Sequence, residues 1–257
     1  MGKTRQLVNA VVFRRILTRW AALAQRADVV DLSRLRVQNN RAKLLRHHLD
    51  RIIAVADSRL ALPAIGSEIF RQPRDSDWGW RPPLWREPIP HKGVASVPSN
   101  TEFGPGSTIF HDCSASELTL RQIRNTRESD LAPYAVRMDV FRFDGSFLSI
   151  AVDLPKDALN GLRRKHLIRM DTQIEAEKTL EIFARLNIKH GPNTEQIVRE
   201  VPLQQGGEMM VEFDLGYSDI AENRLESAWV DLIFEGAQMN QVTIRDLTFC
   251  RLPRADL

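Results

Sequence analysis

The feature that most constrains the fold is an alternation of apolar and polar residues that runs from residue 108 almost to the end of the chain. Short alternating segments bounded by turn residues are typical of β-strands with one buried face. No helical pattern of about 10–15 residues separates them, so we expect an antiparallel arrangement rather than a parallel α/β sheet. About nine or ten such strands favour a mainly β fold, an antiparallel, jelly-roll-like β-sandwich. The predicted strands cover residues 108–112, 117–124, 134–144, 146–154, 165–175, 180–190, 195–203, 208–216, 228–235 and 242–252.

The apolar positions of these strands identify an inner layer. Burying one large apolar side chain contributes about 1.5–3 kcal/mol, so a layer of this size can hold a domain together. Asp144-Gly145, between two of the strands, favours a tight hairpin turn. The predicted inner layer consists of Val136, Met138, Val140, Leu148, Ile150, Val152, Leu154, Leu180, Ile182, Ala184, Leu186, Ile188, Val211, Phe213, Leu215, Val230, Leu232 and Phe234.

The opposite register of the same strands is polar and contains two aromatic residues. On a jelly roll such a face suits carbohydrate, because carboxylates and amides bind hydroxyl groups while aromatic rings stack on sugar rings. The alternative is a solvated face whose opposite charges pair across strands. The candidate ligand-binding residues are Trp229, Asp231, Phe183, Arg185, Asn187 and Asp171.

The alternative to a binding protein is a carbohydrate-active enzyme that uses an acidic pair on the sandwich face. Glycoside hydrolysis needs two carboxylates about 5–9.5 Å apart, and Glu212, Asp214, Asp231 and Glu235 offer such a pair if the fold brings two of them together. The six histidines lie in no catalytic motif, and the sequence contains no phosphate-binding glycine loop, paired Cys-x-x-Cys or His-Glu-x-x-His. We therefore expect a non-catalytic binding or scaffolding protein, and we predict no catalytic residue, metal site or cofactor.

The N-terminal segment, residues 1–62, is helical and basic. Amphipathic patterns predict helices over residues 6–27 and 31–61. The segment holds 13 Lys/Arg and 4 Asp/Glu, a balance of +9, which leaves −6 for the rest of a chain whose net charge is +3. A basic amphipathic helix suits either an anionic membrane surface or a protein partner, and both stay open for residues 3–27. Nucleic acid is disfavoured, because the β domain lacks a basic patch with interleaved aromatics.

Residues 63–107 form a connector rich in proline and glycine, for which we predict no regular structure of its own. Three of the five tryptophans lie within its Trp78–Trp85 segment. A disordered linker rarely contains so many, so we expect the connector to pack against the body of the protein. The predicted division is therefore a helical segment 1–62, a connector 63–107 and a β-sandwich domain 108–257.

No secretory leader or membrane span is visible in the sequence. We expect a cytoplasmic protein, with peripheral association to the inner membrane as the alternative for its basic helices. Cys113 and Cys250 flank the β domain. In that compartment we expect reduced, buried thiols that act as small hydrophobic groups rather than a disulfide.

Several strings resemble an uncharacterised alphaproteobacterial family known only as a domain of unknown function. They are Asp77-Trp78-Gly79-Trp80-Arg81-Pro82, Phe110-His111-Asp112-Cys113, Phe143-Asp144-Gly145-Ser146-Phe147-Leu148-Ser149, His190-Gly191-Pro192-Asn193-Thr194-Glu195 and the closing Arg251-Leu252-Pro253-Arg254-Ala255-Asp256-Leu257. The resemblance extends from about Trp20 to the end of the chain. It implies a bacterial origin and no particular activity, ligand or catalytic residue.

Overall fold

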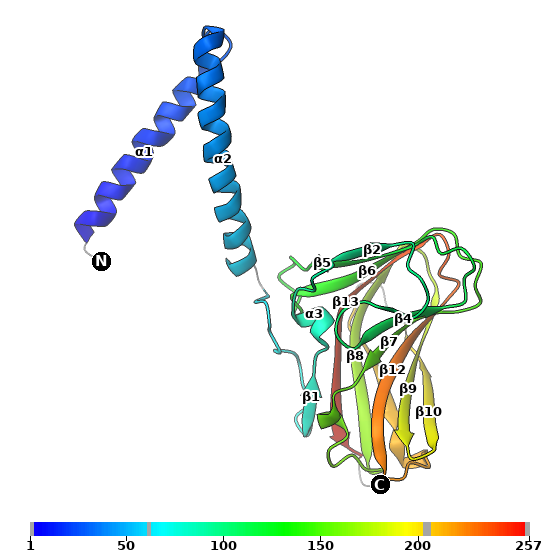
Figure 1. Cartoon of the computed structure of the whole chain (residues 1–257). Helices are drawn as coiled ribbons and strands as arrows, with labels where there is room; N and C mark the ends of the chain where they lie inside the picture. The colour runs from blue at the N-terminus through cyan, green and yellow to red at the C-terminus, as the bar shows by residue number, and fades with distance from the viewer. Residues whose placement is uncertain (1–2, 61–62, 203–206, 255–257) are drawn as a thin grey trace. The chain divides into compact units, whose positions relative to one another are not determined.

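The computed structural model describes residues 3–60, 63–202 and 207–254. Contacts divide the chain into two compact units, a helical unit, Met1–Ser58, and a sandwich unit, Arg59–Leu257. Figure 1 labels most of the helices and strands of both units.

The sandwich unit is built from two antiparallel sheets that face each other (Figure 1). Sheet A has the order β11-β8-β13-β6-β5-β2, and β1 pairs with one end of β13; sheet B has the order β10-β9-β12-β7-β4-β3. The chain passes from one sheet to the other at each step from β6 to β9, as in jelly-roll-like sandwiches. The strands are β1 Trp78–Trp80, β2 Gly93–Ala95, β3 Thr101–Glu102, β4 Ser107–His111, β5 Leu118–Arg124, β6 Tyr134–Val140, β7 Leu148–Asp153, β8 His166–Ala176, β9 Glu181–His190, β10 Asn193–Glu200, β11 Met209–Asp214, β12 Leu225–Glu235 and β13 Asn240–Pro253.

The predicted fold class is confirmed, and the sheet core matches the alternation in the sequence. Each strand predicted from residue 108 onward has a counterpart among β4 to β13. Every residue of the predicted inner layer is buried, and all belong to one core cluster between the sheets. The polar residues that alternate with them therefore lie on the outer faces.

The hairpin predicted at Asp144-Gly145 is wrong, because β6 belongs to sheet A and β7 to sheet B. The connecting loop is held instead by side chains. The Asp144 carboxylate accepts hydrogen bonds from the Ser114 backbone N–H at 3.0 Å and from the Cys113 thiol at 2.7 Å. The Asp112 carboxylate accepts from the Ser146 backbone N–H at 2.7 Å. Placing the strands in facing sheets lets the apolar side of each bury the other.

Residues 63–107 contain regular structure, contrary to the prediction: β1, the short helix α3 Pro83–Arg86, β2 and β3 all lie in this segment. Trp85 of α3 is completely buried, and its indole Nε1–H donates to the Ile244 carbonyl at 3.0 Å. The buried Gln122 side chain of β5 donates to the carbonyls of Leu84 and Glu87. The segment is thus part of the domain core.

A buried ion pair also holds this segment. Arg81 is completely buried, and its Nε and Nη2 donate to the two carboxylate oxygens of Asp246 at 2.9 and 2.8 Å. Arg81 Nη1 donates to the Ser67 carbonyl at 2.8 Å, and the guanidinium lies 5.5 Å from the Phe70 ring centroid. Asp246 follows directly on a register shift in the pairing of β13 with β8. We call this pair the Arg81–Asp246 clamp.

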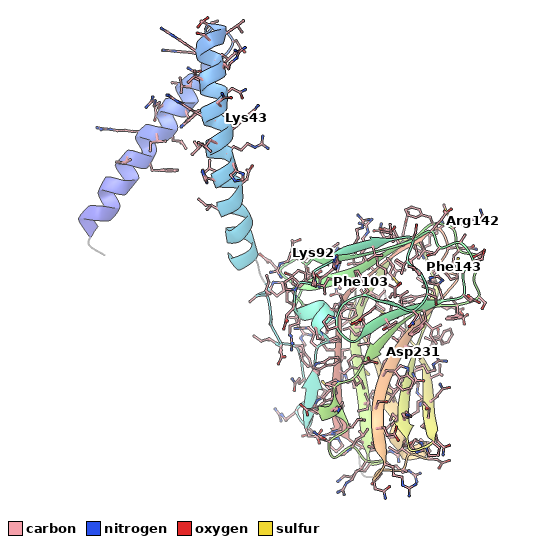
Figure 2. The ribbon with its side chains drawn as sticks, in the orientation of Figure 1. Lys43, Lys92, Phe103, Arg142, Phe143 and Asp231 are labelled. Carbon is pink, nitrogen blue, oxygen red and sulfur yellow. The ribbon has the colours of Figure 1, made fainter. Side chains whose placement is uncertain are left out.

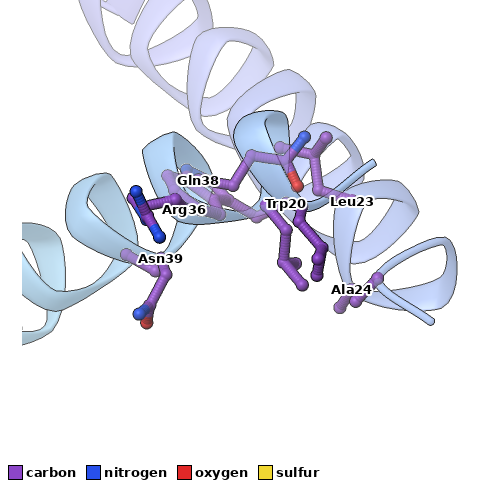
Figure 3. A pocket seen from close by; sticks show the side chains of 10 residues that line it. Trp20, Leu23, Ala24, Arg36, Gln38 and Asn39 are labelled. Atoms are coloured by element: carbon purple, nitrogen blue, oxygen red, sulfur yellow. The ribbon is translucent and has the colours of Figure 1, made fainter. Parts of the chain in front are cut away.

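The helical unit contains α1 Lys3–Gln25 and nearly all of α2 Leu32–Leu60. Asp31 caps the N-terminus of α2, because its carboxylate accepts a hydrogen bond from the Arg34 backbone N–H at 3.3 Å. Among the described residues, no helix is long and apolar enough to span a membrane. A groove of about 620 Å³ lies between the helices, with Trp20, Leu23 and Ala27 on the α1 side and Leu35, Gln38 and Ala42 on the α2 side (Figure 3).

Both cysteines are free. Cys113 is half-buried and Cys250 is buried. The pKa of the Cys250 thiol is raised to about 11, chiefly by burial and then by the charge of Asp171, so this thiol is protonated at neutral pH.

We expect Asp246→Ala to lower the free energy of unfolding by about 3–5 kcal/mol, because it leaves Arg81 as a buried and unpaired charge. Denaturant unfolding measures the change. Glu226→Ala is the control, since Glu226 pairs with Lys189 where both side chains are about half exposed; it should change stability by only about 0–1 kcal/mol. Equal effects of the two substitutions would contradict a stabilising role of the clamp.

Candidate functional site

The candidate site lies on the outer face of sheet B. Antiparallel register sets Trp229 of β12 opposite Asn187 of β9, and Asp231 opposite Arg185. Phe183 lies two residues before Arg185 in β9, so both side chains lie on the same face of the sheet. Five of the six predicted ligand-binding residues therefore come together on two neighbouring strands, and Figure 2 labels Asp231 on β12.

A hydrogen-bonded network fixes the polar members of this group. Arg185 Nε and Nη2 both donate to Asp231 Oδ2, at 2.9 and 2.8 Å, and Asn187 Nδ2 donates to the same oxygen at 2.9 Å. Gln196 Nε2 of β10 donates to Asn187 Oδ1 at 2.9 Å. Asn187 is fully buried and Asp231 is 5% exposed. We call the outer-face residues Phe183, Arg185, Asn187, Gln196, Trp229 and Asp231 the aromatic–polar face.

Three polar atoms of the network remain available. Within the described part of the chain, Asp231 Oδ1, Arg185 Nη1 and Gln196 Oε1 take part in no hydrogen bond. Asp231 Oδ1 is also absent from the sealed, unpaired polar atoms, so it keeps contact with solvent. The face therefore keeps an acceptor, a donor and an amide oxygen without a partner among the described residues.

Asp171, the sixth predicted residue, does not join this group. It lies on β8 in sheet A, opposite Thr248 of β13, and Arg169 holds its carboxylate with Nε–Oδ2 and Nη2–Oδ1 distances of 2.9 and 2.8 Å. The period-two pattern placed it correctly on an outer face. It could not show which of the two sheets carries that face.

The same division separates the four carboxylates considered for hydrolysis. Glu212 and Asp214 lie on β11 in sheet A, whereas Asp231 and Glu235 lie on β12 in sheet B. Asp214 forms an ion pair with Arg254 at 3.2 Å and accepts from the Gly216 backbone N–H at 2.8 Å. Asp231 is bound by Arg185 and Asn187. The carboxylates of Asp214 and Asp231 are therefore engaged in structural contacts.

Sequence reasoning missed several residues of this surface. Gln196 lies on β10, whose sequence shows no clear apolar alternation that would predict the direction of its side chain. A half-buried apolar row also crosses the sheet, from Phe183 of β9 through Ile233 of β12 to Phe110 of β4, with Ser149 of β7 between the last two. The alternation in each strand was visible, but the row depends on register between strands.

Asp153 of β7 is another missed residue, and it lies opposite Trp229. The pKa of Asp153 is raised above its ordinary value, first because neighbouring protein displaces part of its water and second because of the negative charge of Glu102. An acidic group thus borders the tryptophan on the side away from Asn187.

Among the described residues, no group of three or more His, Cys, Asp or Glu side chains is arranged to hold a metal ion.

The model of DUF6478, a family of unknown function, matches residues 1–257, and the chain belongs to that family. No curated protein matches the chain.

Several solved structures resemble the sandwich at low identity. The enzymatically active domain of tailspike protein 4 from bacteriophage CBA120 has a TM-score of 0.41 and 8% identity, covering 61% of this chain but only 21% of its own. The family 11 carbohydrate-binding module from Clostridium thermocellum, solved with a β-1,3-1,4-mixed-linked tetrasaccharide, has a TM-score of 0.38 and 11% identity, covering 65% and 97%. The CBM22-1 xylan-binding domain of Paenibacillus barcinonensis Xyn10C has a TM-score of 0.37 and 8% identity, covering 64% and 94%. Similarity at this level carries no information on ligand or activity.

We expect Asp153→Asn to stabilise the protein at neutral pH. A carboxyl group whose pKa is raised by folding is penalised when ionised, and this penalty disappears as the pH falls below the pKa of the folded state. The stability advantage of the variant should therefore shrink on acidification, which unfolding curves recorded across the acid range can follow. A variant that is less stable than the parent at neutral pH would contradict this assignment.

Proposed function

We propose that this protein is a non-catalytic carbohydrate-binding protein and that the aromatic–polar face is its binding surface. The observation that carries the proposal is the position of the half-buried Trp229 ring beside a fixed polar network with free hydrogen-bonding atoms. An aromatic ring covers the C–H face of a sugar, and preset polar groups bind its hydroxyls.

The network favours hydroxyl ligands over ionic ones. Asp231 and Arg185 neutralise each other through two hydrogen bonds, so neither presents an uncompensated charge to a ligand. What remains is an acceptor on Asp231, a donor on Arg185 and an acceptor on Gln196. A sugar hydroxyl donates and accepts at once, so it matches this combination.

The apolar row from Phe183 to Phe110 supports a chain of sugars rather than a single ring. The row crosses three strand spacings, which corresponds to about 14 Å at about 4.8 Å per spacing. Its members are half-buried, so each exposes part of its apolar surface. An extended glycan lying across the strands would contact Phe183, Ile233 and Phe110.

Binding is favoured over hydrolysis by the roles of the carboxylates. Glu212 and Asp214 lie in the other sheet from Asp231. Asp231 is committed to Arg185 and Asn187, a geometry that orients the carboxylate for recognition.

A glycan panel incubated with the full chain tests this function. We expect a defined oligosaccharide to bind, and Trp229→Ala to weaken that binding roughly 2- to 12-fold, which corresponds to about 0.5–1.5 kcal/mol of stacking. Tyr217→Ala is the matched control, because Tyr217 is 81% exposed and lies outside sheet B. If no glycan binds the folded protein, or if both variants behave alike, the proposal fails.

We further propose a second function for the helical unit, the binding of anionic membrane surfaces. Val12, Phe13, Ile16 and Leu17 of α1 are about half exposed or more, with Phe13 at 66%. Trp20 lines the groove with α2, so the exposed apolar surface of α1 is the one formed by Val12, Phe13, Ile16 and Leu17. α1 contains no acidic residue, and apolar groups beside basic ones suit anionic lipid rather than nucleic acid.

Co-sedimentation of the full chain with phosphatidylglycerol vesicles and with phosphatidylcholine vesicles tests this second function. We expect binding to the anionic vesicles that weakens as salt is added, and a loss of binding in Phe13→Asp. Thr18→Asp is the charge-matched control, since Thr18 is exposed and already polar. Equal loss of binding in both variants would show that the added negative charge, and not the loss of the Phe13 ring, weakens binding. If the protein binds neither vesicle type, the proposed membrane function is excluded.

A further inference from the structure

A polar cavity lies on the outer face of sheet A, whereas the aromatic–polar face belongs to sheet B. It has a volume of about 200 Å³. The connector contributes Phe70 to its lining, the β5–β6 loop contributes Ser129 and Leu131, and strands β8 and β13 contribute Asp171, Gln173 and Thr248. Asp171 is the residue that sequence reasoning had grouped with Trp229.

The lining of the cavity includes an unused hydroxyl group. Thr248 is 4% exposed, yet its Oγ1 forms no hydrogen bond to any residue in the described ranges. Its Oγ1 is also not one of the sealed polar atoms without a partner, so it keeps some contact with solvent, and Thr248 lines the cavity. Because this hydroxyl both donates and accepts, it can form hydrogen bonds with a ligand or with water in the cavity.

The polar groups around Thr248 are fixed by register. Asp171 lies directly opposite Thr248, and Gln173 lies opposite Asp246. Arg169 orients the Asp171 carboxylate, whose oxygens retain further acceptor capacity. The Gln173 amide has no hydrogen-bond partner among the described side chains and backbone. One donor–acceptor hydroxyl, one amide and one carboxylate therefore line the same small space.

The charges around the cavity cancel. Arg169 is paired with Asp171, and Arg71 at the rim is paired with Glu208 at 3.3 Å. The charge of Asp246 is balanced by the completely buried Arg81. Among the described lining residues no charge is left over for an ionic ligand, and the free hydrogen-bonding atoms are those that recognise hydroxyl groups.

The remaining walls are apolar. Phe70 and Leu131 are both half-buried and line the cavity from two different segments. The guanidinium of Arg81 lies over the Phe70 ring, so the clamp that fixes the connector also positions this wall. An aromatic wall facing hydroxyl-binding groups complements a ring with a C–H face and hydroxyl edges.

We infer that this cavity is a binding site for a single neutral sugar ring or cyclic polyol. The volume of about 200 Å³ equals roughly seven waters at about 30 Å³ each, which suits one ring and not a chain. The site shares no residue with the aromatic–polar face, and it stands independently of the function proposed for that face.

Titration calorimetry of the full chain with glucose, galactose, mannose, xylose and myo-inositol, each tested alone, addresses the inference. We expect at least one of them to bind with one site per chain. Thr248→Val removes the hydroxyl at nearly constant volume and should weaken binding about 3- to 10-fold. Ser129→Trp places a large side chain at the exposed rim and should abolish binding without disturbing the core.

Trp229→Ala is the matched control and should leave this binding unchanged, which separates the cavity from the aromatic–polar face. Thermal unfolding of each variant establishes that it is folded. The inference is overturned if none of the five compounds binds the folded parent, or if Ser129→Trp binds as the parent does. Binding that is lost only in Trp229→Ala would assign the sugar to sheet B and overturn it as well.

Discussion

The mutual burial of the two sheet faces is the constraint on which the rest of the structure depends. Each strand exposes one apolar face that can be removed from water only against the face of another sheet. The need to cover both faces places β6 and β7 in opposite sheets, although a turn-forming Asp-Gly dipeptide lies between them. It also sends most of the polar residues that alternate with the core outward, which creates the two surfaces with candidate ligand sites.

The connector completes that core in a way that links stability to the sites. Trp85 fills a fully buried position, and the Arg81–Asp246 clamp fixes the chain just before it. The same clamp holds Phe70 at the cavity on sheet A. One buried ion pair thus joins the Pro-rich segment, the irregular register of β13 and the wall of a proposed binding site.

The two outer faces use similar residues for different geometries. On sheet B, Arg185 and Asp231 pair across strands and leave an open surface bordered by Trp229. On sheet A, Arg169 and Asp171 pair along one strand, and neighbouring loops enclose the space above them. The first arrangement suits an extended ligand and the second a compact one, because enclosure limits what can enter.

The sequence by itself determined the strands from residue 108 onward, their inward and outward residues and the two N-terminal helices, because side-chain direction in a strand or helix follows local periodicity. It also identified five residues that do meet on one face. Only the tertiary structure decided which sheet each strand joins, and this moved Asp171 away from Trp229 and into a separate cavity. It alone revealed β1 and the clamp, because sheet membership and register arise from contacts between segments as distant in sequence as Arg81 and Asp246.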